Sequence, residues 1–170
     1  MFRKYMFPDY DFQTFREITP VFLKNIGKKA LICDIDNTLV PYGIEEPTDE
    51  ICKWFESLRE NGIKIVFVSN NEKSRVAKFC DKIKADYTYK SGKPLKKAAK
   101  NALLKLGTKE SETAVLGDQL LTDVLTAHFS GMTALWVPSI EKVNTLFFRF
   151  KGMIEKPFIK SYFKRKTKND

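Results

Sequence analysis

Short apolar runs alternate with amphipathic stretches along the middle of this chain. The runs at 29–33, 63–68, 113–116 and 132–137 have the composition and length of buried strands, and 86–89 is a shorter one. The stretches between them predict helices at about 48–61, 72–83, 94–106 and 120–131. This alternation predicts right-handed crossovers and a mainly parallel sheet covered on both faces, which is a three-layer α/β Rossmann-like fold.

Polar residues follow directly where three of the predicted strands end. They are Asp34-Ile35-Asp36-Asn37-Thr38, Ser69-Asn70-Asn71 and Gly117-Asp118, with Lys93-Pro94 between the second and third groups and Asp123 after the last. Open α/β sheets bind ligands beyond the carboxyl ends of their strands, so these side chains are predicted to share one site. An isolated aspartate pair favours a turn or a cap, whereas four groups in this order favour magnesium-dependent removal of a phosphoryl group.

The order and spacing of these groups resemble the haloacid dehalogenase superfamily of aspartate-nucleophile phosphohydrolases. The resemblance covers roughly Asp34 to Pro138, and its most specific stretches are Asp34–Val40 and Gly117–Asp123. Within the superfamily the chain is similar to the YqeG-type phosphatases of class III, subfamily A, which are related to phosphatidylglycerophosphate phosphatases. The resemblance implies a phosphatase whose substrate is a lipid headgroup phosphate such as phosphatidylglycerophosphate.

The resemblance also implies a role for each matching residue. Asp34 would be the nucleophile and Asp36 the general acid and base, while Ser69, Asn70 and Lys93 would bind the phosphate. The Mg²⁺ ion would be held by the carboxylates of Asp34 and Asp118 and by the backbone carbonyl of Asp36. Asp123 would orient a water ligand of the ion, and Thr38 would either hold the nucleophile loop or cap a helix.

The short connections between the motifs leave no room for an inserted cap. Only one helix and one strand fit between Asp36 and Ser69, and one more pair fits between Ser69 and Lys93. A capless haloacid dehalogenase-like fold is therefore expected, with an open cleft that suits a macromolecule or a membrane-embedded headgroup. Neither an internal repeat nor a linker divides the chain, so we expect one phosphatase domain over 1–170, with a catalytic body at about 30–142.

The charge of the chain lies in its terminal segments, 1–29 and 143–170. The body at 30–142 holds 16 basic and 16 acidic residues, whereas the first segment has a net charge of +3 and the last a net charge of +6. These two segments also contain 13 of the 22 aromatic residues. Basic, aromatic-rich ends on a neutral body predict an anionic partner, either a phospholipid surface contacted through 143–170 or, less favoured, nucleic acid.

The last segment permits two interpretations. Phe158, Ile159, Tyr162 and Phe163 have helical spacing opposite Lys160 and Lys164, so this helix either lies in a membrane interface or packs its apolar side on the body. Gly152 and Pro157 are expected to break any longer helix.

Several polar residues have weaker claims to function. Asn70 and Asn71 either touch substrate or shape their turn, His128 is expected to be structural, and Lys96, Lys97 and Lys100 are expected to form a solvated helix face.

Two further functions remain open beside the lipid phosphatase. One is a soluble phosphatase of nucleotides, sugars or phosphoproteins, and the other is an RNA- or ribosome-associated binding protein on a phosphatase scaffold.

The three cysteines show no disulfide or metal-site spacing, and neither a secretory signal nor a long apolar run is present. We therefore expect a cytoplasmic protein, which the lipid-surface interpretation of 143–170 would place peripherally on the inner face of the membrane.

Overall fold

The predicted strands lie side by side in one parallel sheet. A computed structural model describes residues 2–169, and in this range the sheet has six strands in the order β1-β6-β5-β2-β3-β4. All neighbouring strands run parallel. The strand bounds are β1 Tyr10–Asp11, β2 Ala30–Cys33, β3 Lys64–Val68, β4 Asp86–Thr88, β5 Thr113–Gly117 and β6 Thr133–Trp136.

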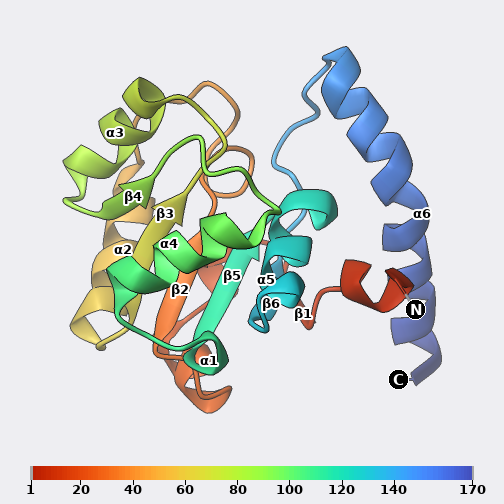
Figure 1. The fold of residues 1–170 in the computed structure, drawn as a ribbon, viewed down its shortest axis with the longest axis horizontal. Helices are drawn as coiled ribbons and strands as arrows, with labels where there is room; N and C mark the ends of the chain where they lie inside the picture. Colours follow the sequence, from red (N-terminus) through yellow and green to blue (C-terminus); the bar gives the residue numbers. More distant parts are fainter. Residues whose placement is uncertain (1, 170) are drawn as a thin grey trace.

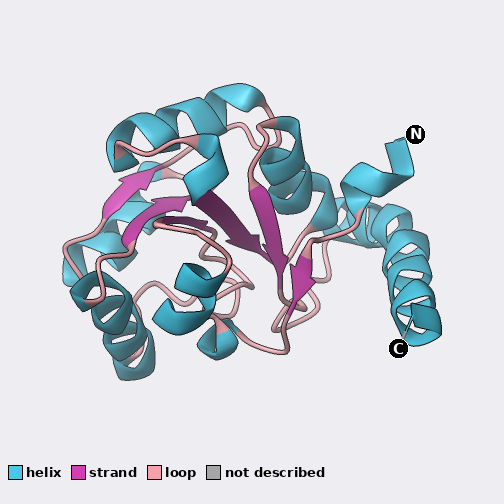
Figure 2. Ribbon diagram, turned by 90° about the horizontal axis from the view of Figure 1, so that it is seen from below, coloured by secondary structure: helices cyan, strands magenta, loops and turns pink. Residues whose placement is uncertain are grey.

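Helices cover both faces of this sheet (Figures 1 and 2). In chain order they are η1 Phe2–Met6, η2 Phe15–Glu17, α1 Pro20–Asn25, α2 Asp49–Glu60, α3 Lys73–Lys82, α4 Lys96–Leu106, η3 Glu110–Glu112, η4 Leu120–Val124, α5 Leu125–Phe129 and α6 Leu146–Asn169. Local residues define the ends of two helices: the Thr48 side chain accepts from the Ile51 amide at the start of α2, and Gly107 ends α4 in the left-handed conformation.

The alternation of side chains along β2 divides the core in two. Leu31 and Cys33 pack with buried residues of α1, α2 and α3, whereas Ala30 and Ile32 pack with residues of η1, α4, η4 and α5. Strands buried on both faces explain why the predicted strands are continuous apolar runs. The architecture confirms the predicted three-layer α/β fold with a parallel sheet, and no separate cap interrupts the described residues.

Two helix predictions need correction. The helix expected at 94–106 begins at Lys96, because the chain turns once more after Pro94. The helix expected at 120–131 is instead a π-helical turn, η4, followed by the short helix α5. Single π-helical turns are frequent at functional sites, and this one carries Asp123.

The helix α6 is continuous, so the predicted break at Gly152 and Pro157 is wrong. Both residues lie on the exposed side of the helix, where water can satisfy the Met153 carbonyl that Pro157 leaves without a helical donor. In Figure 1 α6 lies along one side of the molecule, next to η1. No helix among the described residues is apolar over the length that a membrane crossing requires.

Several aromatic residues of the N-terminal segment lie in the core or pack against it. Phe15 is buried against Trp54, with ring centroids 5.2 Å apart, and Phe12 contacts Phe22 at 4.9 Å. The segment also supplies the edge strand β1, which was not predicted. These aromatic residues stabilise the fold, and they therefore need no partner to explain them.

Candidate active site

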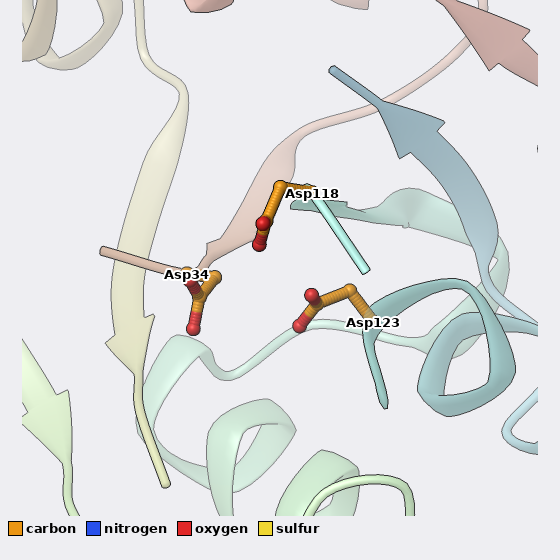
Figure 3. Close-up of side chains that lie close together, drawn as sticks. All are labelled: Asp34, Asp118 and Asp123. Carbon is orange, nitrogen blue, oxygen red and sulfur yellow. The ribbon is translucent and has the colours of Figure 1, made fainter. Parts of the chain in front are cut away.

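Three aspartates converge beyond the carboxyl ends of the central strands. Asp34 follows β2, Asp118 follows β5, and Asp123 comes from η4. One carboxylate oxygen from each lies within 4.8 Å of the other two, and all three residues are buried (Figure 3). Hydrogen-bond register places β2 directly beside β5, which brings these distant parts of the sequence together.

Lys93 is the cation at the centre of this cluster. Its Nζ atom lies 2.5 Å from Oδ1 of Asp34 and 2.7 Å from Oδ1 of Asp123, and its side chain is only 3% exposed. Burial alone would lower the pKa of Lys93, but the carboxylates of Asp123 and Asp34 outweigh that effect and raise it. The ammonium group therefore stays charged where a phosphoryl group would approach Asp34.

Three carboxylates against one ammonium leave the cluster short of positive charge. Burial raises the pKa of Asp34 to about 6, with a further rise from Asp123 that Lys93 opposes. Burial, Asp34 and Asp123 likewise raise the pKa of Asp118 well above its ordinary value. Buried, convergent carboxylate oxygens are the ligands that a hard cation such as Mg²⁺ prefers, so the donor set fits the predicted ion.

Hydroxyl groups hold two of the carboxylates in place. The Thr38 hydroxyl lies 3.1 Å from Oδ2 of Asp34 and 3.2 Å from Oδ1 of Asp118, and no helix starts there, which favours the nucleophile-loop role over the capping role. Ser139 donates to Oδ2 of Asp118 at 2.6 Å. Ser139 was missed by the sequence analysis, although its place shortly after the end of β6 could have indicated it.

Gly117 is required by the close approach of Asp123. A Cβ atom on Gly117 would lie 2.2 Å from Cγ of Asp123, far inside contact distance. The Asp123 carboxylate also accepts from the backbone amide of Gln119 at 3.2 Å and from the Thr122 hydroxyl at 3.2 Å. Asp123 thus ties the loop after β5 to Lys93.

Asp36 lies in a separate charge pair beside the cluster. Its Oδ1 atom accepts from Nη2 of Arg75 at 2.8 Å, and its Oδ2 atom lies 3.4 Å from the side-chain amide of Asn71. Both side chains of the ion pair are about nine-tenths buried. Arg75 was missed by the sequence analysis because nothing distinguishes it from the other basic residues of α3.

Ser69 and Asn70 line the same cavity but differ in their contacts. The Ser69 hydroxyl accepts from the backbone amide of Asn71 at 3.0 Å, and Ser69 lines the cavity. The Asn70 side chain instead holds the neighbouring loop: its Oδ1 atom accepts from the Lys93 amide at 2.9 Å and from the Ser91 hydroxyl at 2.8 Å. These contacts favour the turn-shaping interpretation for Asn70 and connect it to the loop that carries Lys93.

The cavity above the cluster has a volume of about 400 Å³. Its wall includes Tyr42, Gln119 and Thr122, and Lys151 reaches it from α6. Nζ of Lys151 donates to Oε1 of Gln119 at 2.7 Å, and one turn later the buried Glu155 accepts from the Leu121 amide at 2.8 Å. Neither residue of α6 was predicted, because only tertiary packing distinguishes them from the other charged residues of that segment.

The remaining predicted residues lie away from the cluster. His128 contacts the Tyr5 carbonyl at 2.8 Å and Asp9 at 3.1 Å, which joins α5 to the N-terminal segment and fits its expected structural role. Burial works against protonation of His128, but Asp9 and the Tyr5 carbonyl raise its pKa. Lys96, Lys97 and Lys100 are exposed on α4, as predicted for a solvated face.

Comparison with known proteins gives consistent results at the level of sequence. The model of a family described as haloacid dehalogenase-like hydrolase matches residues 40–131, a range that begins after Asp34 and Asp36. The chain is 36% identical over 166 residues to a Bacillus subtilis protein named "Probable phosphatase YqeG". That match covers 98% of this chain and 96% of the relative.

Solved structures share the fold at low sequence identity. An uncharacterized protein from Listeria monocytogenes serotype 4b superposes with a TM-score of 0.54 at 15% identity, over 69% of this chain and 86% of that one. The cobalt-bound form of the deoxy-D-mannose-octulosonate 8-phosphate phosphatase from Haemophilus influenzae superposes with a TM-score of 0.53 at 14% identity, over 82% of this chain and 91% of that one.

Proposed function

Since the chain belongs to the haloacid dehalogenase-like hydrolase family and is one of its phosphatases, we propose that it is a magnesium-dependent phosphomonoesterase with Asp34 as nucleophile. The observation that carries the proposal is the contact of Asp34 with Lys93 inside the cluster of Asp118 and Asp123. A phosphomonoester dianion needs this arrangement, because a nucleophilic oxygen must approach it while cations neutralise its charge.

The first half of the reaction transfers the phosphoryl group to the enzyme. An oxygen of the Asp34 carboxylate attacks phosphorus, and the bond from phosphorus to the leaving oxygen breaks as Asp36 gives that oxygen its proton. Lys93 and the Ser69 hydroxyl bind the oxygens of the moving phosphoryl group. Arg75 and Asn71 hold the Asp36 carboxylate beside the cavity.

The second half releases phosphate. A water molecule attacks phosphorus of the aspartyl phosphate, Asp36 takes the proton of that water, and the bond between phosphorus and the Asp34 oxygen breaks. The carboxylates of Asp34 and Asp118 and the backbone carbonyl of Asp36 would hold Mg²⁺, with Asp123 in support. When bound, the ion would neutralise charge on the phosphoryl oxygens.

For the substrate we propose a lipid headgroup phosphate such as that of phosphatidylglycerophosphate. The support comes from the outer face of α6, where Leu146, Phe150 and Met153 are 84%, 59% and 65% exposed at helical spacing. The same face continues into the exposed side chains of Lys160 and Lys164. An apolar stripe followed by basic residues suits an anionic lipid surface.

Phosphate release tests this function directly. The purified protein, freed of metal with EDTA, should release phosphate from monoesters only after Mg²⁺ is added, with Co²⁺ as the comparison ion. Asp34→Asn should reduce turnover to the assay background, because an amide is a poor nucleophile, while its far-ultraviolet circular dichroism stays that of the wild type. Wild-type turnover in folded Asp34→Asn would exclude the mechanism.

The choice of substrate needs a second comparison. Vesicle-borne phosphatidylglycerophosphate should give the highest kcat/KM in a panel with soluble nucleotide, sugar and phosphopeptide monoesters. A preference for a soluble monoester would leave the phosphatase in place and replace the lipid substrate. RNA bound with no phosphate release from any substrate would favour the binding-protein alternative.

A further inference from the structure

Arg75 is a cation of α3 that the protein encloses almost completely. Its side chain is 10% exposed, and its Nη2 atom donates to Oδ1 of Asp36 at 2.8 Å. Its Nη1 atom donates to the Glu45 carbonyl at 3.3 Å, and the guanidinium carbon lies 5.7 Å from the centre of the buried Phe79 ring. Contacts with three residues therefore restrict the guanidinium to one position.

The remaining nitrogen of this guanidinium indicates that stability alone does not set its position. Nε of Arg75 is buried and has no hydrogen-bond partner among residues 2–169. A buried donor without a partner costs free energy, and such groups are uncommon in folded proteins. The contact with Asp36 is kept in spite of this cost, which points to a role of Arg75 in the reaction that Asp36 serves.

The two carboxylate oxygens of Asp36 differ in how firmly they are held. Oδ1 accepts a charge-assisted hydrogen bond from Arg75, of a kind about twice as strong as a neutral one. Oδ2 lies 3.4 Å from the side-chain amide of Asn71, which is long for a hydrogen bond. Both Asp36 and Asn71 line the cavity. A proton on Oδ1 would face the N–H group of Arg75, whereas Oδ2 can exchange its weak contact for a ligand in the cavity.

We propose that Arg75 is a positioning residue that fixes Oδ1 of Asp36 and thereby makes Oδ2 the oxygen that carries the proton. In the first half of the reaction the proton moves from Oδ2 to the leaving oxygen, which keeps the electron pair of its broken bond to phosphorus. In the second half Oδ2 takes a proton from the water whose oxygen bonds to phosphorus, as the bond from phosphorus to Asp34 breaks. This inference rests on the proposed phosphomonoesterase function and adds that Arg75 acts through Asp36.

The test compares two substrates whose leaving oxygens differ in their need for a proton. The p-nitrophenolate ion is stable as an anion, whereas the alkoxide that leaves from glycerol 3-phosphate must be protonated. Arg75→Met keeps a long apolar side chain and removes the donors. Its kcat/KM for glycerol 3-phosphate should fall about a hundredfold, the scale of an ångström-level misplacement, and its kcat/KM for p-nitrophenyl phosphate should fall much less. Because kcat/KM covers the steps up to the aspartyl phosphate, it isolates the half in which Asp36 acts as an acid.

A double-mutant cycle separates positioning from a structural role. Asp36→Asn should show the same selective loss on glycerol 3-phosphate. Adding Arg75→Met to Asp36→Asn should cause little further loss, because no acid is left to position. Arg75→Lys keeps a charged donor and should lose less than Arg75→Met with the same selectivity. It therefore provides the comparison if Arg75→Met does not fold.

Lys78→Met is the matched control for the loss of a cation from α3. Lys78 lies three residues after Arg75 and pairs with the Glu45 side chain, while about half of its own side chain is exposed. It contacts the same loop as Arg75 but pairs with Glu45 instead of Asp36. Lys78→Met should therefore keep the wild-type kcat/KM on both substrates.

The outcomes distinguish this inference from the proposed function. Equal losses on the two substrates in folded Arg75→Met overturn the inference, and so do wild-type values on both. A further loss when Arg75→Met is added to Asp36→Asn also overturns it. Failure of the wild-type protein to release phosphate from either substrate, or equal losses in Asp36→Asn, would instead reject the proposed function. A selective loss that disappears in the Asp36→Asn background supports the inference.

Discussion

The strand-end loops and the helix α6 both contribute to one cavity but are constructed differently. In the loops, side chains such as those of Asp34, Lys93 and Asp123 are buried and bind one another at 2.5–2.7 Å. In α6 the contacts with the body are separate and spread over several turns, from Lys151 through Glu155 to Tyr162, whose hydroxyl donates to Asp11 at 2.7 Å.

This difference determines how each region responds to a change. A displaced atom in the loops moves several charged groups together, because they share hydrogen bonds in a buried place. A displaced atom in α6 weakens one contact and leaves the others, because each is made by a different turn of the helix. Substitutions in the loops should therefore affect chemistry, whereas those in α6 should affect binding and docking.

A matched pair of glycines gives the largest contrast between the regions. In Gly117→Ala the new Cβ atom would meet Cγ of Asp123 at 2.2 Å, so Asp123 must move and Lys93 must move with it. We expect kcat to fall about a hundredfold, the scale of an ångström-level misplacement, and the free energy of unfolding to fall by about 1–3 kcal/mol. Steady-state kinetics and urea unfolding measure the two effects.

The control for this substitution lies in α6. At Gly152 a Cβ atom would meet nothing within 4 Å, so Gly152→Ala should keep kcat and stabilise the helix by about 0.5–1 kcal/mol. Equal activities of the two variants would show that the loops tolerate displacement as well as α6 does, and the comparison would be wrong.

Metal binding should stabilise the loops in a pH-dependent way. The pKa of Asp34, raised to about 6 by burial, lies above its ordinary value, so in metal-free protein its ionisation lowers stability as pH rises through about 6. Mg²⁺ needs the ionised carboxylates, so it should bind more weakly at pH 5. At one concentration, about a hundred times the Kd for Mg²⁺ at pH 8, the ion should raise the melting temperature by about 5–10 °C at pH 8 but much less at pH 5.

The variant Asp118→Asn provides the matched measurement. It removes one carboxylate from the cluster and should lose most of the Mg²⁺-dependent rise at pH 8 in differential scanning calorimetry. A rise of the same size at both pH values, or one that survives in Asp118→Asn, would place the ion outside the cluster of Asp34, Asp118 and Asp123.

The two regions also differ in what the sequence could reveal. Asp34, Asp118 and Asp123 were predictable because apolar runs locate the strands, and a parallel sheet brings its carboxyl ends together. The superfamily followed from these motifs and the α/β fold from the alternation of apolar runs and amphipathic stretches, and both are confirmed. The hydrogen bonds of Asn70 with the Lys93 loop were not predictable, because an exposed polar residue after a strand suits both a turn and a ligand.

The role of α6 could not be read from its sequence for a physical reason. Phe158 and Ile159 pack on the core, but apolar residues at this spacing are equally typical of a membrane-interface helix. Arg75 and Lys151 lie among many exposed basic residues, and only tertiary packing selects them. Local helix rules also overstated the effect of Pro157, since the loss of one exposed hydrogen bond does not stop a helix that is anchored on both sides of it.

The outer face of α6 should contribute to activity only on lipid vesicles. Replacing Leu146, Phe150 and Met153 together by serine removes an exposed apolar stripe without opening the core, so activity on vesicle-borne substrate should fall about tenfold or more. Activity on a soluble monoester should change little. The control Leu104→Ser removes a side chain that is 72% exposed on α4 and should change neither rate. Equal vesicle activity in all three proteins would contradict a membrane contact through α6.

The smallest expected effect concerns the anchor of α6. Burial raises the pKa of Glu155 to about 7, above its ordinary value, even though the Leu121 amide donates to its carboxylate. The contribution of this side chain to stability is therefore complete at low pH and is lost as pH rises through about 7.

Glu155→Gln keeps the acceptor for the amide and stays neutral. Between pH 5.5 and pH 8 the free energy of unfolding of the wild type should therefore fall relative to that of the variant by about 2 kcal/mol. Urea unfolding of both proteins at the two pH values measures this difference, and the subtraction removes the titration of Asp34 and Asp118, which both proteins share. A constant difference would mean that Glu155 is already solvated in the folded protein and that Phe158, Ile159 and Tyr162 hold α6 in place without it.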